Sequence, residues 1–300
     1  HTGLELGATV YLDYSITSKP GYLPEINVCR QLEQSSPVKE YEISITVPQG
    51  QRLEYALDNL KSKPLVTEKE GMKQVSWVLK NLPALSREPQ VSVIGGELPL
   101  LTATTEQKPM AFLSAQWERE ADARLRTLAG KLTAGAKSDE EKVKALHSYV
   151  IDNLYYSPLP LSETAYRIRP TAEVLRSAYA TEAEKANLLA ALLRAAGLKA
   201  EIGAVCVPSA NTASLGMGSI RELFVWTEAG GRQQALSLKG KTPSAVSWQK
   251  DYAYVAMLTQ PFELNLPSVA LNKEYTLQPD KAKAKDGYLV FTRSEEHTSE

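Results

Sequence analysis

The chain contains little of the two residue types that most catalytic and metal sites need. Among its 300 residues there are only two cysteines, Cys29 and Cys206, and three histidines, His1, His147 and His297. Two cysteines so far apart do not make a disulfide framework. A zinc site needs several sulfur or imidazole ligands, and two of the three histidines lie at the ends of the sequence. The sequence therefore predicts no metal and no cofactor.

An excess of one charge and a long apolar run are also missing. The chain has 34 Lys and Arg residues against 35 Asp and Glu residues, which gives a formal net charge of -1. Such a balance does not predict attraction to nucleic acid or to a membrane surface by a broad electrostatic field. No apolar run is long enough to cross a bilayer. The composition is that of an ordinary globular protein, and the length suits about two domains.

Neither end of the sequence looks like the end of a natural reading frame. There is no initiator Met, and the first residues already read as the middle of a domain. Residues 293–300 resemble the translation of a sequencing adapter, so they are left out of the fold prediction. We therefore expect a fragment of a longer gene, in which the absence of a signal peptide carries no information.

Residues 1–108 carry the alternation of a β domain. Apolar side chains recur at every second position over 10–16, over 41–47 and over 75–79, as on half-buried strands. Turn signals such as Lys19-Pro-Gly21 separate these segments. Short alternating strands with regular turns favour an antiparallel β-sandwich.

Residues 109–265 combine helical spacing with later strands. The apolar pattern predicts one helix over 109–136 and a second that starts with the capping box Ser138–Glu141. A third helix starts with the capping box Thr181–Glu184 and ends at Gly197. It is apolar on nearly every side, so it should be buried. The strands expected after it cover 199–207, 220–227, 232–238 and about 251–258.

A short motif before and inside the buried helix carries a family resemblance. Its anchors are the pairs Arg169-Pro170, Val174-Leu175, Lys185-Ala186 and Leu188-Leu189. With this spacing, residues 167–201 resemble the core of a bacterial transglutaminase-like domain. The run around 142–157 resembles the first helix of that fold. The stretch from about 40 to 89 resembles the β-rich domain of unknown function that often precedes it.

The resemblance implies an α+β fold. We expect an N-terminally truncated antiparallel β-sandwich over 1–108 and a papain-like transglutaminase-like domain over 109–265, with helices packed on an antiparallel sheet. The start of a C-terminal β segment would follow over 266–292, and 293–300 would be an artefact. The family also implies export, with a periplasmic location in the bacterial envelope, by analogy alone.

The same resemblance points to three site positions. In this family a Cys opens the buried helix, where the helix dipole lowers the pKa of its thiol, and a His and an Asp follow on two strands. Aligned without gaps, the Cys falls on Glu182. The short strand patterns that carry the His and the Asp in the family place the His on Glu222 and the Asp on Ser237, each to within one residue. The resemblance thus predicts a degenerate triad with no catalytic residue of the usual kind.

Two interpretations of these carboxylates stay open. A carboxylate at a helix N-terminus is stabilising by roughly 0.3–1 kcal/mol, so Glu182 can be a purely structural replacement. Alternatively, Glu182 and Glu222 face each other and act as an acid and a base or hold a divalent cation. Tyr179, Arg221 and Trp226 are candidates for lining the cleft, although aromatic residues more often fill a core.

Three functional hypotheses follow from the sequence. The first is a non-catalytic pseudoenzyme that binds a peptide, a protein or a glycan of the cell envelope. The second is an enzyme of altered chemistry that uses Glu182 and Glu222. The third is an ordinary cysteine enzyme, which would need a relocated pair such as His147 with Cys206; a buried free Cys is more often a small core residue.

Overall fold

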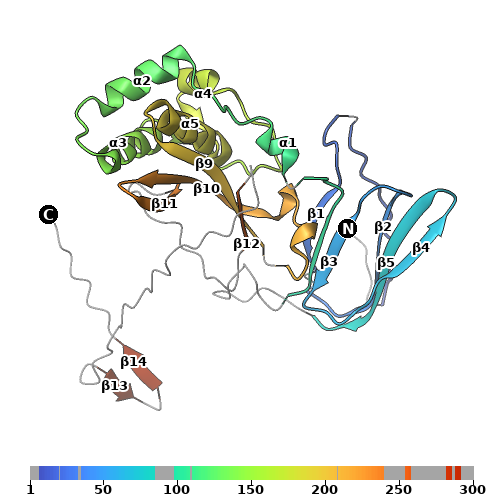
Figure 1. Cartoon of the computed structure of the whole chain (residues 1–300). Coiled ribbons are helices and arrows are strands. Elements are labelled where there is room, and N and C mark those ends of the chain that lie inside the picture. Colours follow the sequence, from blue (N-terminus) through green and yellow to red (C-terminus); the bar gives the residue numbers. More distant parts are fainter. Residues whose placement is uncertain are drawn as a thin grey trace. The chain divides into compact units, whose positions relative to one another are not determined.

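The computed structural model describes residues 7–19, 21–32, 35–84, 98–108, 110–207 and 209–239, and the backbone of 254–257, 282–285 and 288–291. The chain divides into two units, His1–Leu264 and Asn265–Glu300. The first unit is a mixture of antiparallel sheets and helices, which confirms the predicted α+β class (Figure 1).

Two three-stranded antiparallel sheets form the N-terminal part. One has the order β1-β6-β3 and the other β2-β5-β4. The strands are β1 (Asn27–Gln31), β2 (Val38–Pro48), β3 (Glu54–Asp58), β4 (Leu65–Lys69), β5 (Met72–Leu82) and β6 (Leu100–Thr104). Buried side chains from both sheets share one hydrophobic core, so the sheets pack face to face as the alternation predicts.

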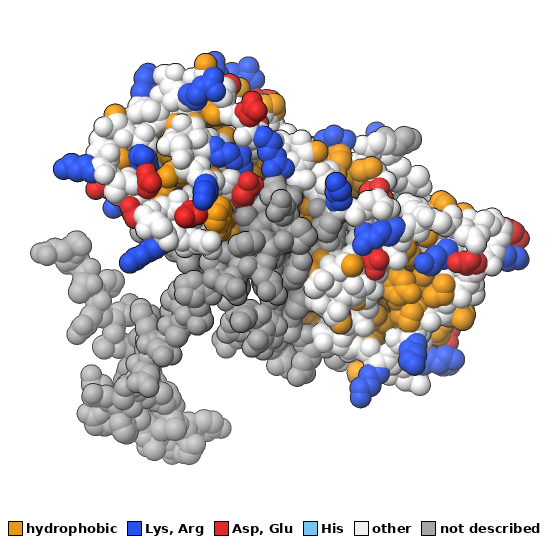
Figure 2. Space-filling view, viewed as in Figure 1, with side chains coloured by type: hydrophobic (Ala, Val, Ile, Leu, Met, Phe, Trp, Pro, Cys, Tyr) orange, Lys and Arg blue, Asp and Glu red, His pale blue; other side chains and the backbone are white. Residues whose placement is uncertain are grey.

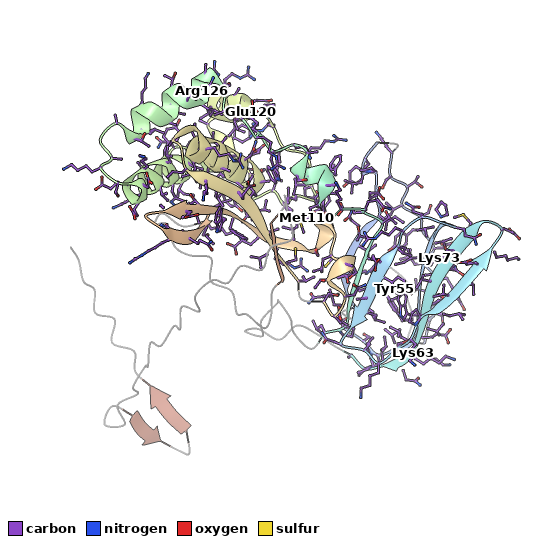
Figure 3. All side chains as sticks on the ribbon, viewed as in Figure 1. Tyr55, Lys63, Lys73, Met110, Glu120 and Arg126 are labelled. Carbon is purple, nitrogen blue, oxygen red and sulfur yellow. The ribbon has the colours of Figure 1, made fainter. Side chains whose placement is uncertain are left out.

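The alternation in β2 and β5 explains this packing. Ile43, Ile45 and Val47 of β2 lie at every second position, and Ile45 is paired with Val75 of β5. Their side chains point to the same side of the sheet, toward the core. The ring of Tyr55, on β3 of the opposite sheet (Figure 3), meets the Trp77 ring edge-on at 5.5 Å between centroids.

Strand β6 is buried on both of its faces. Leu101 and Ala103 point into the core between the two sheets, whereas Leu100 belongs to the core of the helical part. The hydroxyl of Thr102 is 2.6 Å from the hydroxyl of Ser214, in the loop between β9 and β10. This one strand therefore contributes to both cores.

Helices and a second sheet form the rest of the first unit. The helices are α1 (Ala111–Ser114), α2 (Ala123–Thr133), α3 (Asp139–Asp152), α4 (Thr171–Ser177) and α5 (Glu182–Ala195). The sheet has the order β11-β10-β9-β12, with β9 (Lys199–Cys206), β10 (Ile220–Ala229), β11 (Arg232–Ser237) and β12 (Tyr254–Met257). All pairings in it are antiparallel, and all four predicted strands are present. This part also contains a short parallel pair of strands, β7 (Tyr155–Tyr156) and β8 (Tyr179–Ala180). Two 3-10 turns lie between β9 and β10, η1 (Thr212–Ser214) and η2 (Met217–Ser219).

Helix α5 is the centre of the helical part, as its composition predicts. Every residue from Ala183 to Leu193 is buried, and the helix packs against α2, α3, β9 and β10. Its capping box is present: the Thr181 hydroxyl accepts from the Glu184 amide, and the Glu184 carboxylate accepts from the Thr181 amide. The start of this helix is therefore fixed at one place.

Two sequence expectations are wrong. No strand forms over 10–16, because no described strand pairs with it, and its large apolar side chains are exposed. The single helix expected over 109–136 is two helices, α1 and α2. The backbone between them turns away because the Glu118 amide donates to the Asn187 side chain at 2.9 Å, and the Asp122 carboxylate then caps a new helix by accepting from the Leu125 amide.

The second unit is described only as a short hairpin. β13 (Ala282–Lys285) pairs antiparallel with β14 (Tyr288–Phe291), which agrees with the strand expected near the end of the chain. The strand expected at Tyr275–Leu277 lies outside the described residues. Across the described part of the chain, no helix has the length and apolar character needed to cross a membrane.

Candidate functional site

Glu182 is the first residue of α5, and two groups hold its carboxylate. The amide of Leu223, on β10, donates to Glu182 Oε1 at 3.4 Å. The ammonium of Lys239, two residues after β11, lies 3.5 Å from the same oxygen. The Glu182 side chain is 20% exposed, so this ion pair lies partly below the surface.

Glu222 and Ser237 lie close to Glu182, as the alignment expects. The Ser237 hydroxyl donates to Glu222 Oε1 at 3.5 Å and accepts from the Lys239 amide at 3.3 Å. Glu222 is also close enough to Glu182 for its negative charge to act on the Glu182 pKa. The structure thus gathers the three predicted positions at the start of α5, beside the start of β10 and the end of β11.

Burial raises the pKa of Glu182 above the usual range of a glutamate, and the negative charge of Glu222 adds to this shift. Lys239 and the Leu223 amide oppose the shift, but they do not cancel it. Glu182 therefore holds a proton more readily than an exposed glutamate. The described residues include no cluster of three or more His, Cys, Asp or Glu side chains that could hold a metal ion.

His147, on α3, contacts this site through Ser237. It is fully buried, and its Nε2 lies 2.8 Å from the backbone oxygen of Ser237. A carbonyl oxygen only accepts, so Nε2 carries the proton in this contact. Burial lowers the pKa of His147, which keeps the ring neutral. Its Nδ1 has no hydrogen-bond partner among the described residues.

The two cysteines have other partners than His147. Cys29, on β1, lies 3.7 Å from Nη2 of Arg221, and Cys206 interacts with the Ser219 hydroxyl. Burial raises the pKa of Cys206 to about 12, which keeps its thiol protonated and unreactive. These contacts supply no support for a relocated cysteine–histidine pair.

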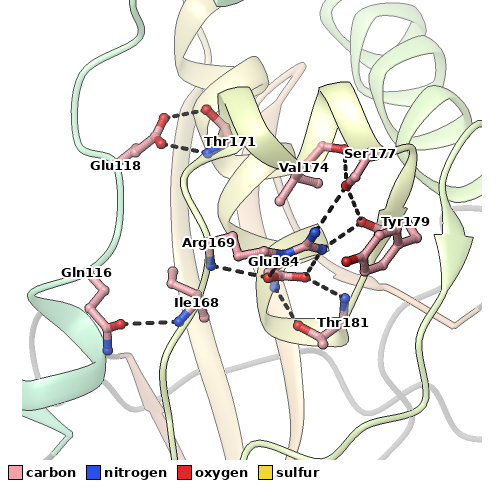
Figure 4. A network of polar contacts seen from close by, with 10 residues as sticks. All are labelled: Gln116, Glu118, Ile168, Arg169, Thr171, Val174, Ser177, Tyr179, Thr181 and Glu184. Carbon is pink, nitrogen blue, oxygen red and sulfur yellow. Dashed lines mark hydrogen bonds and ion pairs between the residues drawn. The ribbon is translucent and has the colours of Figure 1, made fainter. Parts of the chain in front are cut away.

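A polar network fixes the loop before α5 (Figure 4). Both oxygens of the buried Glu184 carboxylate bind the Arg169 guanidinium, through Nε at 2.7 Å and Nη2 at 2.8 Å. The same carboxylate accepts from the backbone amides of Arg169 and Thr181. Burial alone would raise the pKa of Glu184, but these donors outweigh it and lower the pKa. The Glu184 carboxylate thus ties the Arg-Pro motif to the helix start.

Further hydrogen bonds extend this network toward α1. The Glu118 carboxylate accepts from the amide and the hydroxyl of Thr171, at 2.8 and 2.6 Å. The Gln116 side chain accepts from the Ile168 amide (Figure 4). The segment before α4 is therefore held on both sides, which positions the end of α5 that carries Glu182.

The three candidate cleft residues lie in different surroundings. The half-exposed ring of Tyr179 stacks under the Arg169 guanidinium at 4.1 Å from its centroid. Arg221 is exposed and contacts Cys29. Trp226 lies in the middle of β10, paired with Ala235 and Glu201, and its buried Nε1 has no hydrogen-bond partner among the described residues. No contact between these side chains joins them into one surface, so their role in binding stays a prediction.

A pocket beside Glu182 was not predicted from the sequence. It has a volume of about 800 Å³ and lies between the end of α3, strand β7, helix α5 and the end of β11. Lys185 and Lys239 both line it, together with Tyr156. One signal in the sequence was available, since Lys185 is a charged residue inside a helix that consists mostly of Ala and Leu.

The transglutaminase-like superfamily matches residues 126–235. The chain contains a transglutaminase-like domain. The domain of unknown function DUF3857 matches residues 1–86, which is the β-rich domain expected before it. Both matches agree with the resemblance carried by the motif around Arg169 and Lys185. No curated protein matches the chain.

One solved structure supports the same fold. A crystal structure of a candidate protease from Parabacteroides distasonis is 36% identical, with a TM-score of 0.78 over 87% of this chain. This chain spans only 51% of that protein. Two other solved structures are more distant. A candidate cysteine protease from Cytophaga hutchinsonii is 13% identical, with a TM-score of 0.34 over 73% of this chain and 71% of that one. The periplasmic domain of TgpA from Pseudomonas aeruginosa is also 13% identical, with a TM-score of 0.30 over 77% of this chain and 90% of that one. Their TM-scores are too low to support a shared fold.

Proposed function

We propose that this transglutaminase-like domain is non-catalytic and serves as a binding or scaffold module for a peptide, a protein or a glycan. The observation that carries the proposal is the state of Glu182. It occupies the helix start where the family's chemistry needs a thiolate, and its carboxylate is held by Lys239 and by the Leu223 amide. A carboxylate bound in this way supplies no acyl-transfer nucleophile of the cysteine type.

The rest of the site supports the same proposal. A cysteine mechanism needs a histidine that exchanges the thiol proton. The one histidine at this site, His147, is buried with a lowered pKa and is bound to the Ser237 backbone. Glu222 and Ser237 stand at the two other positions that the alignment assigns. The site is built as a polar contact network rather than as a thiol–imidazole pair.

The test is a direct assay for turnover. The intact chain is incubated with a labelled peptide library for hydrolysis, with an amine and a glutamine donor for transamidation, and with a thiol-directed electrophile. We expect no turnover and no labelling at the α5 start. Hydrolysis or transamidation that survives in the Cys29→Ala and Cys206→Ala variants but is lost in Glu182→Gln would overturn the proposal.

One observation favours a second candidate function, an enzyme of altered chemistry. Glu182 has a raised pKa and Glu222 lies close to it, an arrangement in which one carboxyl acts as an acid and the other as a base. In that case Glu182→Gln and Glu222→Gln each abolish turnover, whereas the exposed Glu120→Gln leaves it unchanged. Equal rates in all three variants would remove this candidate.

The proposed location is the bacterial envelope, outside the cytoplasm. It rests on the family resemblance alone. Side chains of both signs are interspersed over the visible face of the described part (Figure 2), which gives no support for nucleic acid as a partner. Expression of the natural full-length gene with fractionation of the cell compartments tests the location, and recovery in the cytoplasm contradicts it.

A further inference from the structure

The pocket beside Glu182 contains a charge that the fold itself does not neutralise. Lys185 is only 2% exposed, yet no carboxylate in the described part of the chain lies within ion-pair distance of its ammonium. The ring of Tyr156 lies beside this ammonium, 5.7 Å from Nζ to the ring centroid. Burial lowers the pKa of Lys185, and the charge of Asp152 at the pocket rim only partly offsets this.

Keeping such a lysine is costly for the folded chain. An ammonium on a largely buried side chain, without an ion-pair partner, loses part of its hydration and gains little in return. Lysine normally limits this cost by extending its head group to water. Here the side chain lines an open pocket of about 800 Å³. A cavity of this size admits a small ligand or the end of a larger one.

The other walls of the pocket indicate which ligand it fits. Lys239 supplies a second ammonium, which shares its charge with Glu182 over 3.5 Å. Ile151, Leu154 and Leu238 supply apolar surface. Two ammonium groups next to apolar walls suit an anion that is attached to an apolar group. A carboxylate is an anion of this kind, and it binds well to lysine through charge-assisted hydrogen bonds.

We propose that this pocket binds the free carboxylate of a peptide whose last side chain is apolar, with Lys185 as the principal cation and Lys239 as the second. A sugar acid shares the carboxylate, but a sugar ring needs several hydrogen-bonding side chains around it. Asp152, Asn153, Tyr155 and Tyr156 also line the pocket and could bind hydroxyl groups, but most of the lining surface is apolar, which suits an aliphatic side chain better than a ring covered with hydroxyl groups. The pocket therefore fits a peptide terminus better. This inference rests on the proposed function, since it names the ligand of the same binding module.

The experiment compares ligands that differ in one group. The tripeptide Ala-Ala-Leu, its C-terminal amide and glucuronic acid are titrated into the intact chain by isothermal titration calorimetry. The same titrations use Lys185→Met, Lys239→Met and, as a matched control, Lys199→Met. Lys199 is exposed and pairs with Glu228 on the far part of the sheet. ¹³C-labelled lysine side chains report in parallel whether the ligand reaches a lysine.

We expect the free acid to bind at least about tenfold more tightly than the amide, because a charge-assisted contact is lost with the amide. Lys185→Met should weaken the acid by about the same factor, Lys239→Met by less, and Lys199→Met not at all. Equal binding of acid and amide would overturn the inference without any variant. Unchanged affinity in Lys185→Met, or binding of none of the three probes, would also overturn it.

A glucuronic acid that binds in preference to the peptide would overturn the assignment to a peptide. The outcome is separable from that of the proposed function. If the chain turns over a substrate and still prefers the free acid, only the non-catalytic proposal is contradicted. If there is no turnover and the acid binds no better than the amide, only this inference is contradicted.

Discussion

The Glu184 carboxylate offers a direct measure of what holds the start of α5 in place. It is 4% exposed and accepts four hydrogen bonds, three from Arg169 and one from the Thr181 amide. In Glu184→Gln the side chain keeps its size but loses the charge and one acceptor oxygen. Its new NH₂ group then faces N–H donors of Arg169 or Thr181, so at least one buried donor is left without a partner.

The expected loss follows from these contacts. Breaking a buried ion pair by removing one partner costs about 3–5 kcal/mol, and a single charge-assisted hydrogen bond contributes about 1.5–3 kcal/mol. The Arg169 side chain is 23% exposed, so solvent weakens the pair and lowers the figure. We expect Glu184→Gln to reduce the free energy of unfolding by roughly 2–4 kcal/mol.

The assay is urea unfolding followed by far-ultraviolet circular dichroism, with the exposed Glu120→Gln as the matched control. Arg169→Met and the double variant complete a cycle that isolates the pair. The Glu184 pKa is lowered, so its contribution is present above the unfolded pKa of about 4.3 and is lost as the pH falls through the folded value. Glu184→Gln should flatten that loss. A decrease below about 1 kcal/mol in Glu184→Gln would refute the reasoning.

Other variants test packing and charge. Gly203→Ala should lower the free energy of unfolding by about 1–3 kcal/mol, because its Cβ would overlap the Phe224 ring. Gly130→Ala, with open space around its Cβ, should raise the free energy of unfolding by up to about 1 kcal/mol. Equal effects of the two variants in urea unfolding would contradict this. The lowered pKa of His147 means that its stabilisation is present above about pH 6.5 and declines below it, so nuclear magnetic resonance should find the ring titrating at a lower pH than an exposed histidine. Lys185→Met should raise the melting temperature, because it removes an ammonium without an ion-pair partner from a largely buried side chain; a lower melting temperature would contradict this reasoning.

The sequence predicts the elements that have a strong local signal. The N-cap hydroxyls of Ser138 and Thr181 mark the starts of α3 and α5, because each accepts a hydrogen bond from the first turn of its helix. Only Thr181 completes the predicted capping box, since the Glu141 carboxylate accepts from the Lys137 amide and not from Ser138. The strands of the second sheet follow from apolar runs between turns. The segment 109–136 fails because its break depends on the Asn187 side chain, which is distant in sequence. Residues 10–16 fail because alternation describes a strand only when a partner is present.

The candidate site follows the same rule. The family motif locates Glu182, Glu222 and Ser237, and the structure brings them together because β10 begins and β11 ends beside the first residue of α5. The pocket could not be predicted, since it is a space between four elements and not a pattern in one. The role of Lys239 could not be predicted for the same reason. A lysine after a strand is ordinary in a sequence, and only the structure shows that it pairs with Glu182.

Strand β6 has a consequence for how the first unit melts. Its five residues are divided between two cores, with Leu101 and Ala103 on one side and Leu100 on the other. If one core unfolds, β6 leaves its place, and the other core then loses the side chains that β6 contributes to it. We therefore expect one calorimetric transition rather than two. A ligand that binds only the folded helical part would then slow hydrogen exchange in the sandwich as well, although it touches no residue there.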